Sequence, residues 1–220
     1  LNKDELFIFV PSFKLVRSPQ IFADFVAEND SATTKIKLIN GEETIVLNAG
    51  FYNLNNAVNG EKIEVPYQAN LLIESVSPEN WIELGETNSI INGNISISGS
   101  SLFDLTSPVN IVADLKNSVY YGNTFNKFLI DGKYQGKWAE ANLDLETGFG
   151  RIYGEAKVQN VDSENPDYQL KLTAENINPI SFVSELDSTI LNAELDVKGT
   201  GVSPSKANVK AEVKVFNSTV

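Results

Sequence analysis

The chain has 220 residues, with no Cys, no His and a formal net charge of −12. Without Cys it forms no disulfide and no thiolate metal site, and without His it lacks the commonest general base and metal ligand. The 17 Lys and Arg residues are scattered singly, which disfavours nucleic acid and anionic membrane surfaces as partners. A content of 42% hydrophobic and 21% charged residues predicts a folded chain, and no apolar run is long enough to span a bilayer.

Alternation of apolar and polar residues predicts about a dozen β-strands. In residues 191–199, for example, Leu191 and Leu195 fall on one face, whereas Asn192 and Asp196 fall on the other. In chain order the expected strands lie near residues 6–10, 33–39, 43–48, 63–76, 90–98, 109–116, 124–131, 137–146, 151–158, 168–175, 191–199 and 207–215. Turn dipeptides predict short connections and hence antiparallel pairing of neighbours; they are Asn40-Gly41, Asn59-Gly60, Asp131-Gly132 and Thr147-Gly148.

Helical signals are few. Residues 77–84 place Ser77 at a plausible N-cap and Pro78 at the first helical position, and residues 178–186 repeat this pattern. Residues 17–30 open in a similar way and form a third candidate. We therefore expect an all-β chain with helices of only one or two turns as connections.

An internal repeat organises the chain. The segment YQANLLIESVSPENWI at 67–82 recurs as YQLKLTAENINPISFV at 168–183, and IINGNISISG at 90–99 recurs as ILNAELDVKG at 190–199. A long internal period is typical of arrays in which each unit buries its apolar face against its neighbours. It favours an extended scaffold or binding surface over a compact enzyme.

The repeat predicts the domain organisation. We expect a partial and loosely matched first repeat over residues 1–85, a second over 86–186 that ends in a short helix, and the truncated start of a third over 187–220. The chain opens on Leu1, so we expect a fragment of a longer protein. Trp81 and Phe182 hold the same place in the two copies, which indicates plugs at the repeat joints rather than stacking platforms for a ligand.

The apolar faces of the expected strands require a cover. About twelve strands with roughly four apolar side chains each present on the order of 2,400 Å², whereas the largest apolar patch on a soluble monomer is about 300–600 Å². Either two sheets meet in a sandwich, or one sheet forms a trough that a ligand covers in part. The residues expected to line such a groove are Ala113, Leu115, Ala139, Ala141, Leu143, Leu145, Ile152, Ala156, Val158, Leu191, Ala193, Leu195, Val197, Ala207, Val209, Ala211, Val213 and Val215.

Residues 90–220 resemble the AsmA/TamB family of Gram-negative envelope proteins, and the first ninety residues do so loosely. The resemblance rests on a Y-x-L-x-L segment at 168–172 and on LNAELDVKGTGVSP, which carries Gly199, Gly201 and Pro204. It implies an extended, taco-like antiparallel β-groove in the periplasm, whose parent is anchored in the inner membrane. It also implies that the groove carries phospholipid toward the outer membrane, and that an Omp85-type protein is a partner in outer-membrane protein assembly.

The remaining motifs indicate no enzyme, metal site or cofactor. No G-x-S-x-G motif occurs, and the paired carboxylates Asp144 and Glu146 fall on the solvent face of a strand. We therefore expect a groove that binds phospholipid or fatty acyl chains and contacts membranes only through other parts of the parent. The alternatives are a structural or adhesive β-sandwich array without a ligand, and a factor for outer-membrane protein assembly.

Overall fold

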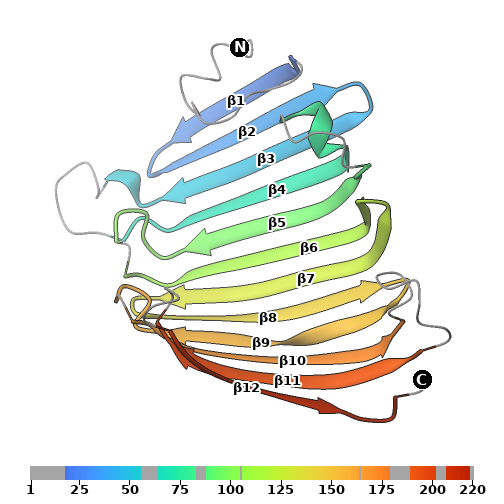
Figure 1. Ribbon diagram of the computed structural model, residues 1–220. Coiled ribbons are helices and arrows are strands. Elements are labelled where there is room, and N and C mark those ends of the chain that lie inside the picture. The colour runs from blue at the N-terminus through green and yellow to red at the C-terminus, as the bar shows by residue number, and fades with distance from the viewer. Residues whose placement is uncertain are drawn as a thin grey trace.

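Twelve strands form one antiparallel sheet in which each strand pairs with its neighbours in sequence (Figure 1). The computed structural model describes residues 18–55, 64–82, 88–104, 106–163, 165–178, 189–201 and 207–218. The strands are β1 (Gln20–Glu28), β2 (Ser31–Asn40), β3 (Glu43–Tyr52), β4 (Tyr67–Val76), β5 (Ile91–Gly99), β6 (Val109–Tyr120), β7 (Asn123–Gln135), β8 (Trp138–Thr147), β9 (Gly150–Gln159), β10 (Asp167–Ile177), β11 (Leu191–Thr200) and β12 (Asn208–Val215). A 3₁₀-helix, η1 (Pro78–Asn80), follows β4.

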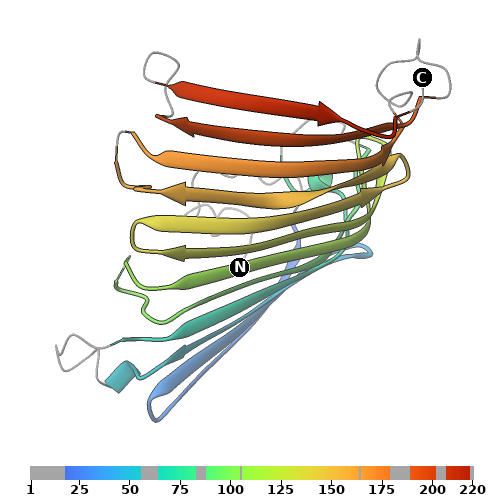
Figure 2. The ribbon, with the colours of Figure 1, turned by 90° about the horizontal axis from the view of Figure 1, so that it is seen from below.

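The sheet is open, which confirms the prediction of an extended all-β fold. β1 and β12 lie at its two ends and do not pair with each other, and the described strands form no second layer (Figure 2). The sandwich alternative is therefore not the architecture of this chain. The exposed surface is 14036 Å², whereas a compact monomer of this size exposes about 10,000 Å². The excess is consistent with a single sheet whose two faces both meet solvent.

Two expectations about local structure are wrong. Residues 17–30 were expected to begin a helix, but Gln20–Glu28 forms β1, because pairing with β2 along its whole length outweighs a weak helical pattern. Asp131-Gly132 was expected to be a turn, but it lies inside β7, where Gly132 pairs with Ile111 on one side and Ala141 on the other.

The expected connecting helix after Ser77 is present only as the three-residue η1, and Ser77 makes no capping bond with its side chain. Residues 6–10, Asn59-Gly60, and all of 178–186 except residue 178 lie outside the described residues.

A hydrogen-bonded bulge bends the sheet where β4, β5 and β6 meet. The Ser75 amide N–H donates to Asn92 Oδ1 over 2.8 Å, and Asn92 Nδ2 donates to the Asn117 carbonyl over 3.1 Å. The Asn92 N–H donates to Ser118 Oγ over 2.9 Å. Ser75 and Asn117 have positive φ angles of 54° and 48°, a conformation that Asn tolerates better than most residues. One Asn side chain thus satisfies the backbone groups that the bulge releases.

The same bulge recurs one repeat later. The Asn176 N–H donates to Asn192 Oδ1 over 2.8 Å, and Asn192 Nδ2 donates to the Asn217 carbonyl over 2.9 Å. The Asn192 N–H donates to Ser218 Oγ over 3.0 Å. Strands β10, β11 and β12 therefore correspond to β4, β5 and β6, so the structural period is six strands. The expected boundaries after residues 85 and 186 stay a prediction, since the sheet continues across both.

Replacing the bridging amide should destabilise the sheet. Asn92→Ala leaves the Ser75 N–H and the Asn117 carbonyl without their partner, so we expect a loss of about 1–3 kcal/mol in the free energy of unfolding, measured by urea denaturation. Asn142→Ala is the matched control, because Asn142 is exposed in β8 and makes no side-chain hydrogen bond to any described residue. It should change stability by less than about 0.5 kcal/mol. Equal effects of the two changes would contradict this role of Asn92.

Candidate ligand-binding face

The strand register collects apolar residues on one face along the whole sheet. One cross-strand row, for example, passes from Leu143 in β8 through Gly154, Leu172 and Leu195 to Val213 in β12. Four such rows cross all twelve strands, because paired residues of neighbouring strands point to the same side. The rows contain no charged residue. Their polar groups are the hydroxyls of Thr34 and of three tyrosines; the tyrosines are Tyr67, Tyr134 and Tyr168.

The structure places sixteen of the eighteen expected lining residues in these four rows. Of the other two, Leu191 continues the same face beyond the β10–β11 bulge, opposite Ile177, and Ala207 is an exposed residue just before β12. The expected list left out the contributions of β1 to β5, β7 and β10. The signal was available, since Ile36 and Leu38, or Ile95 and Ile97, show the same alternation.

This apolar face has little cover from the described residues. Ala32, at 7% exposure, is the only member of the four rows that is buried, and the rest are half-buried or exposed. Ile111 in the middle of the sheet is 42% exposed and Val213 near its end is 65% exposed. An apolar surface of this extent is typical of a site that binds a partner or an apolar ligand.

At the centre of the sheet, one of the rows consists of small residues only. Gly132, Ala141 and Ala156 are consecutive members of one row, between Ile111 in β6 and Leu170 in β10. Small residues leave open space above the backbone. The larger side chains on either side limit the extent of this space. A narrow apolar chain lying across the strands here would contact backbone and methyl groups.

An aromatic hollow of about 340 Å³ opens on this face beside the first bulge. Its volume lies within the usual range for small-molecule sites. Phe125 and Phe128 contribute together because a register shift of β7 lies between them; strict alternation would place them on opposite faces. For this reason the sequence pattern alone missed the hollow. Its lining residues are Ile91, Leu115, Ser118, Tyr120, Phe125, Phe128 and Leu145.

Trp81 closes one rim of the sheet. Trp81 is 7% exposed, and its indole N–H donates to the Glu43 carboxylate at the start of β3. Asn80 Nδ2 donates to the same carboxylate over 2.5 Å, so both partners come from η1 and the residue after it. Trp81 is therefore a structural contact. Its counterpart Phe182 lies outside the described residues.

The opposite face is polar and carries the ion pairs. In β8, the Asp144 carboxylate lies 2.8 Å from Arg151 Nε and 2.6 Å from Lys127 Nζ. Hydrogen bonds from Arg151 and then from Lys127 lower the pKa of Asp144 from 3.8 to about 2. Of the two paired carboxylates expected on this face, Asp144 thus forms cross-strand salt bridges.

This lowered pKa predicts a dependence of stability on pH. Asp144 stabilises the fold fully above its unfolded pKa near 3.8, and this contribution disappears as the pH falls through about 2. Screening by solvent reduces the contribution to about 1–2 kcal/mol. Asp144→Asn should therefore lower the free energy of unfolding at pH 7, and the gap to the wild type should close between about pH 4 and pH 2. A gap that stays constant over this range, measured by urea unfolding at each pH, would contradict the assignment.

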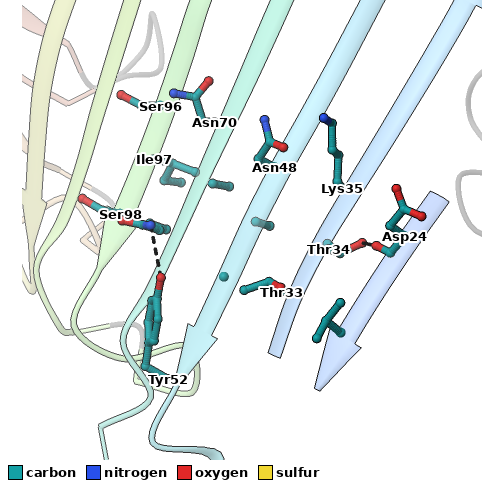
Figure 3. Close-up of a pocket in the computed structure, with 15 residues that line it drawn as sticks. Asp24, Thr33, Thr34, Lys35, Asn48, Tyr52, Asn70, Ser96, Ile97 and Ser98 are labelled. Carbon is teal, nitrogen blue, oxygen red and sulfur yellow. Dashed lines mark hydrogen bonds between the residues drawn. The ribbon is translucent and has the colours of Figure 1, made fainter. Parts of the chain in front are cut away.

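The polar face also has a shallow hollow of about 570 Å³ over β1 to β5 (Figure 3). Asn48, Asn70 and Ser96 lie opposite one another in one cross-strand row, and Gln68 Nε2 donates to Tyr52 Oη over 3.2 Å. These amides and hydroxyls offer hydrogen bonds to a polar ligand or to water. The hollow contains one carboxylate and one ammonium group, Asp24 and Lys35, which are paired in register.

Neither face assembles a metal-binding group from the described residues. No three Asp or Glu side chains among them come close enough to hold a metal ion. Within the same residues no helix has the length and apolar character needed to cross a membrane.

No protein family, curated protein or solved structure matches this chain.

Proposed function

We propose that this chain is a segment of a periplasmic β-groove that binds fatty acyl chains and carries phospholipid between the inner and outer membranes. The observation that carries the proposal is the apolar face: four rows in register across twelve strands, without a charged side chain and largely uncovered. A face of this kind is stable in water only when something apolar covers it for much of the time.

The shape of the face favours a long, flexible apolar ligand. The rows run across the strands, with neighbouring strands about 4.8 Å apart, so twelve strands give an apolar path about 53 Å long. An acyl chain can lie anywhere along such a path, because no side chain within the rows imposes a fixed polar contact. The ligand could therefore slide along the face without breaking specific bonds, which is what transport requires.

The periplasmic location and the anchoring of the parent in the inner membrane are proposed from the resemblance in residues 90–220. That resemblance also favours phospholipid over other apolar cargo. The polar face fits this proposal, because its ion pairs and amides keep the outer side of the groove in water while the apolar side holds the ligand.

Two measurements test the proposal. Mass spectrometry of an organic extract of the purified chain should identify co-purified phospholipid or fatty acid. A fluorescent fatty acid added to the delipidated chain should give saturable binding and a blue-shifted emission. If extracts contain no lipid and the probe does not bind, the proposal is wrong and the chain is better described as a structural β array.

A further inference from the structure

The polar face of β3 to β6 differs in charge from the polar face of β9 to β12, although the two sets of strands correspond in the repeat. β3 pairs with β4 as β9 pairs with β10. Two cross-strand rows of the first set contain no charged side chain; their members are Asn48, Asn70, Ser96 and Val112, and Gly50, Gln68, Ser98 and Asn110. The corresponding residues of the second set are Glu155, Lys171, Asp196 and Glu212, and Lys157, Gln169, Lys198 and Lys210, of which only Gln169 is uncharged.

The charged rows form ion pairs, whereas the polar groups of one neutral row have no partners. Lys157 lies 2.9 Å from Glu155, its neighbour on the same face of β9. The side chains of Asn48, Asn70 and Ser96 make no hydrogen bond with any described residue. Charged side chains are sufficient to keep such a face in water, as they do in the second set. The neutral row therefore indicates a site for a neutral ligand that forms hydrogen bonds.

A tyrosine ring lies over this neutral surface. Tyr52 ends β3, and Gly50 lies two residues earlier on the same face. A Cβ on Gly50 would lie 2.9 Å from Tyr52 Oη and 3.3 Å from Tyr52 Cζ, so the ring lies back over the glycine (Figure 3). Gln68 Nε2 donates to Tyr52 Oη over 3.2 Å and holds the ring there. The first copy thus presents an aromatic surface at the place where the second copy has Lys157.

These groups line the polar hollow of about 570 Å³, a volume within the usual range for ligand sites. The amides, the tyrosine ring and the serine hydroxyls come from β3, β4 and β5, and each of these strands pairs on both sides. The one carboxylate and the one ammonium group of the hollow, Asp24 and Lys35, lie opposite each other. The hollow therefore has no net charge that would attract an ion.

A carbohydrate fits this set of groups. Each amide offers two donors and one acceptor oxygen, which match the hydroxyls of a sugar because each hydroxyl both donates and accepts. The tyrosine ring offers an apolar surface to the C–H groups on one side of a sugar ring. A peptide strand would instead need unpaired backbone groups at a sheet edge, and β3, β4 and β5 have no free edge.

The spacing of the groups indicates an extended chain of sugars. Asn48, Asn70 and Ser96 follow one another at one residue per strand, and neighbouring strands lie about 4.8 Å apart. This distance is comparable to the length of one sugar unit in an extended β-1,4-linked glycan, so successive units meet successive side chains. An α-1,4-linked chain coils and does not keep its units in line at this spacing.

We propose that the polar face over β3 to β5 binds a neutral, extended β-1,4-linked glycan. The glycan lies across the strands, its hydroxyls bond to Asn48, Asn70 and Ser96, and one sugar ring contacts Tyr52. This site is on the face opposite the apolar rows, so it neither requires nor excludes an acyl chain. The chain can then hold a glycan on one face and a lipid on the other.

Calorimetric titration with three hexasaccharides tests the class of ligand. Cellohexaose and chitohexaose are neutral and β-1,4-linked, whereas maltohexaose is neutral and α-1,4-linked. We expect saturable binding of at least one β-linked probe, with an affinity at least about tenfold higher than that of maltohexaose. If neither β-linked probe binds, or if maltohexaose binds equally well, the proposal is wrong.

Two variants of Tyr52 test the aromatic contact. Tyr52→Ala should weaken binding of the β-linked probe about tenfold, because it removes the ring. Tyr52→Phe keeps the ring and removes only the hydroxyl, so its affinity should stay within about threefold of the wild type. Circular dichroism checks that both variants are folded. Wild-type affinity in Tyr52→Ala overturns the proposal. Fatty-acid binding should be unchanged in both variants, which separates this result from a failure of the proposed lipid transport.

An exchange between the two copies tests where the glycan binds. Asn48→Glu/Asn70→Lys/Ser96→Asp gives the first copy the charges of the second, in an arrangement that the sheet already accommodates there. This variant should stay folded and lose binding of the β-linked probe. A folded variant with wild-type affinity contradicts the assignment of the site.

The reverse exchange is the matched control. Glu155→Asn/Lys171→Asn/Asp196→Ser alters the corresponding row of the second copy and leaves the proposed site intact. It should bind the probe with wild-type affinity. A comparable loss of binding in this variant would mean that the glycan does not depend on the neutral row of the first copy, and the proposal would fail.

Discussion

Gly154→Ala should reduce the free energy of unfolding by about 3 kcal/mol, the upper end of the usual cost of overpacking. Gly154 lies in the middle of β9, in one of the four apolar rows, opposite Leu172 of β10. A Cβ at this position would overlap the Lys171 carbonyl oxygen and lie 2.9 Å from Leu172 Cα. Both are backbone atoms, so the β9–β10 ladder itself must move to admit a methyl group. Urea unfolding should show a lower midpoint.

Gly148→Ala is the control for this substitution. Gly148 lies in the two-residue turn between β8 and β9, only six positions earlier, and a Cβ there would meet no atom within 4 Å. The change in composition is identical, so only the local contacts differ. We expect a change in stability of less than about 0.5 kcal/mol. If Gly154→Ala were as mild as Gly148→Ala, the close approach of β9 and β10 would not contribute to stability.

The sequence was sufficient to predict the class of fold and one face of the sheet. Alternation in strands such as 191–199 and 207–215 predicts the face of each residue without knowledge of its partner, because side chains in a strand alternate strictly. Short turns such as Asn40-Gly41 predict the antiparallel order. The repeated Asn92 and Asn192 segments indicated a periodic structure, although not that each period contains six strands.

Alternation alone does not decide whether the sheet opens or doubles into a sandwich, since both architectures use the same alternating face; the expectation of an open groove came from the resemblance. β-Bulges also limited what the alternation of apolar and polar residues could predict. Phe125 and Phe128 are three residues apart and share a face only because the register shifts between them. Alternation does not detect such a shift, and the aromatic hollow was missed for that reason.

The polar hollow was missed for a different reason. It depends on which residues of five separate strands lie opposite one another, such as Asn48 and Asn70. Register between strands is set by pairing, and no single strand contains that information. The same reason prevents prediction of the Asp144 salt bridges, in which Lys127 and Arg151 come from the two flanking strands.

Ala141→Trp should abolish most fatty-acid binding while leaving the sheet folded. Ala141 occupies the middle of the Gly132–Ala141–Ala156 stretch, the lowest part of the apolar face. An indole ring there would stand across the path that an acyl chain must follow. The sheet has no second layer among its described strands, so the ring has solvent above it and does not overpack a core.

The decisive comparison is with Asn142→Trp, one residue further along β8 and on the polar face. Both variants add an exposed indole to the same strand, so general effects of a large side chain on β8 are shared. We expect melting temperatures close to the wild type for both and loss of fluorescent fatty-acid binding for Ala141→Trp alone. Marked destabilisation by Ala141→Trp would mean that this face is packed against other parts of the protein. Equal binding by the two variants would mean that acyl chains, if bound, do not use this path, and the proposed transport along the rows would fail with it.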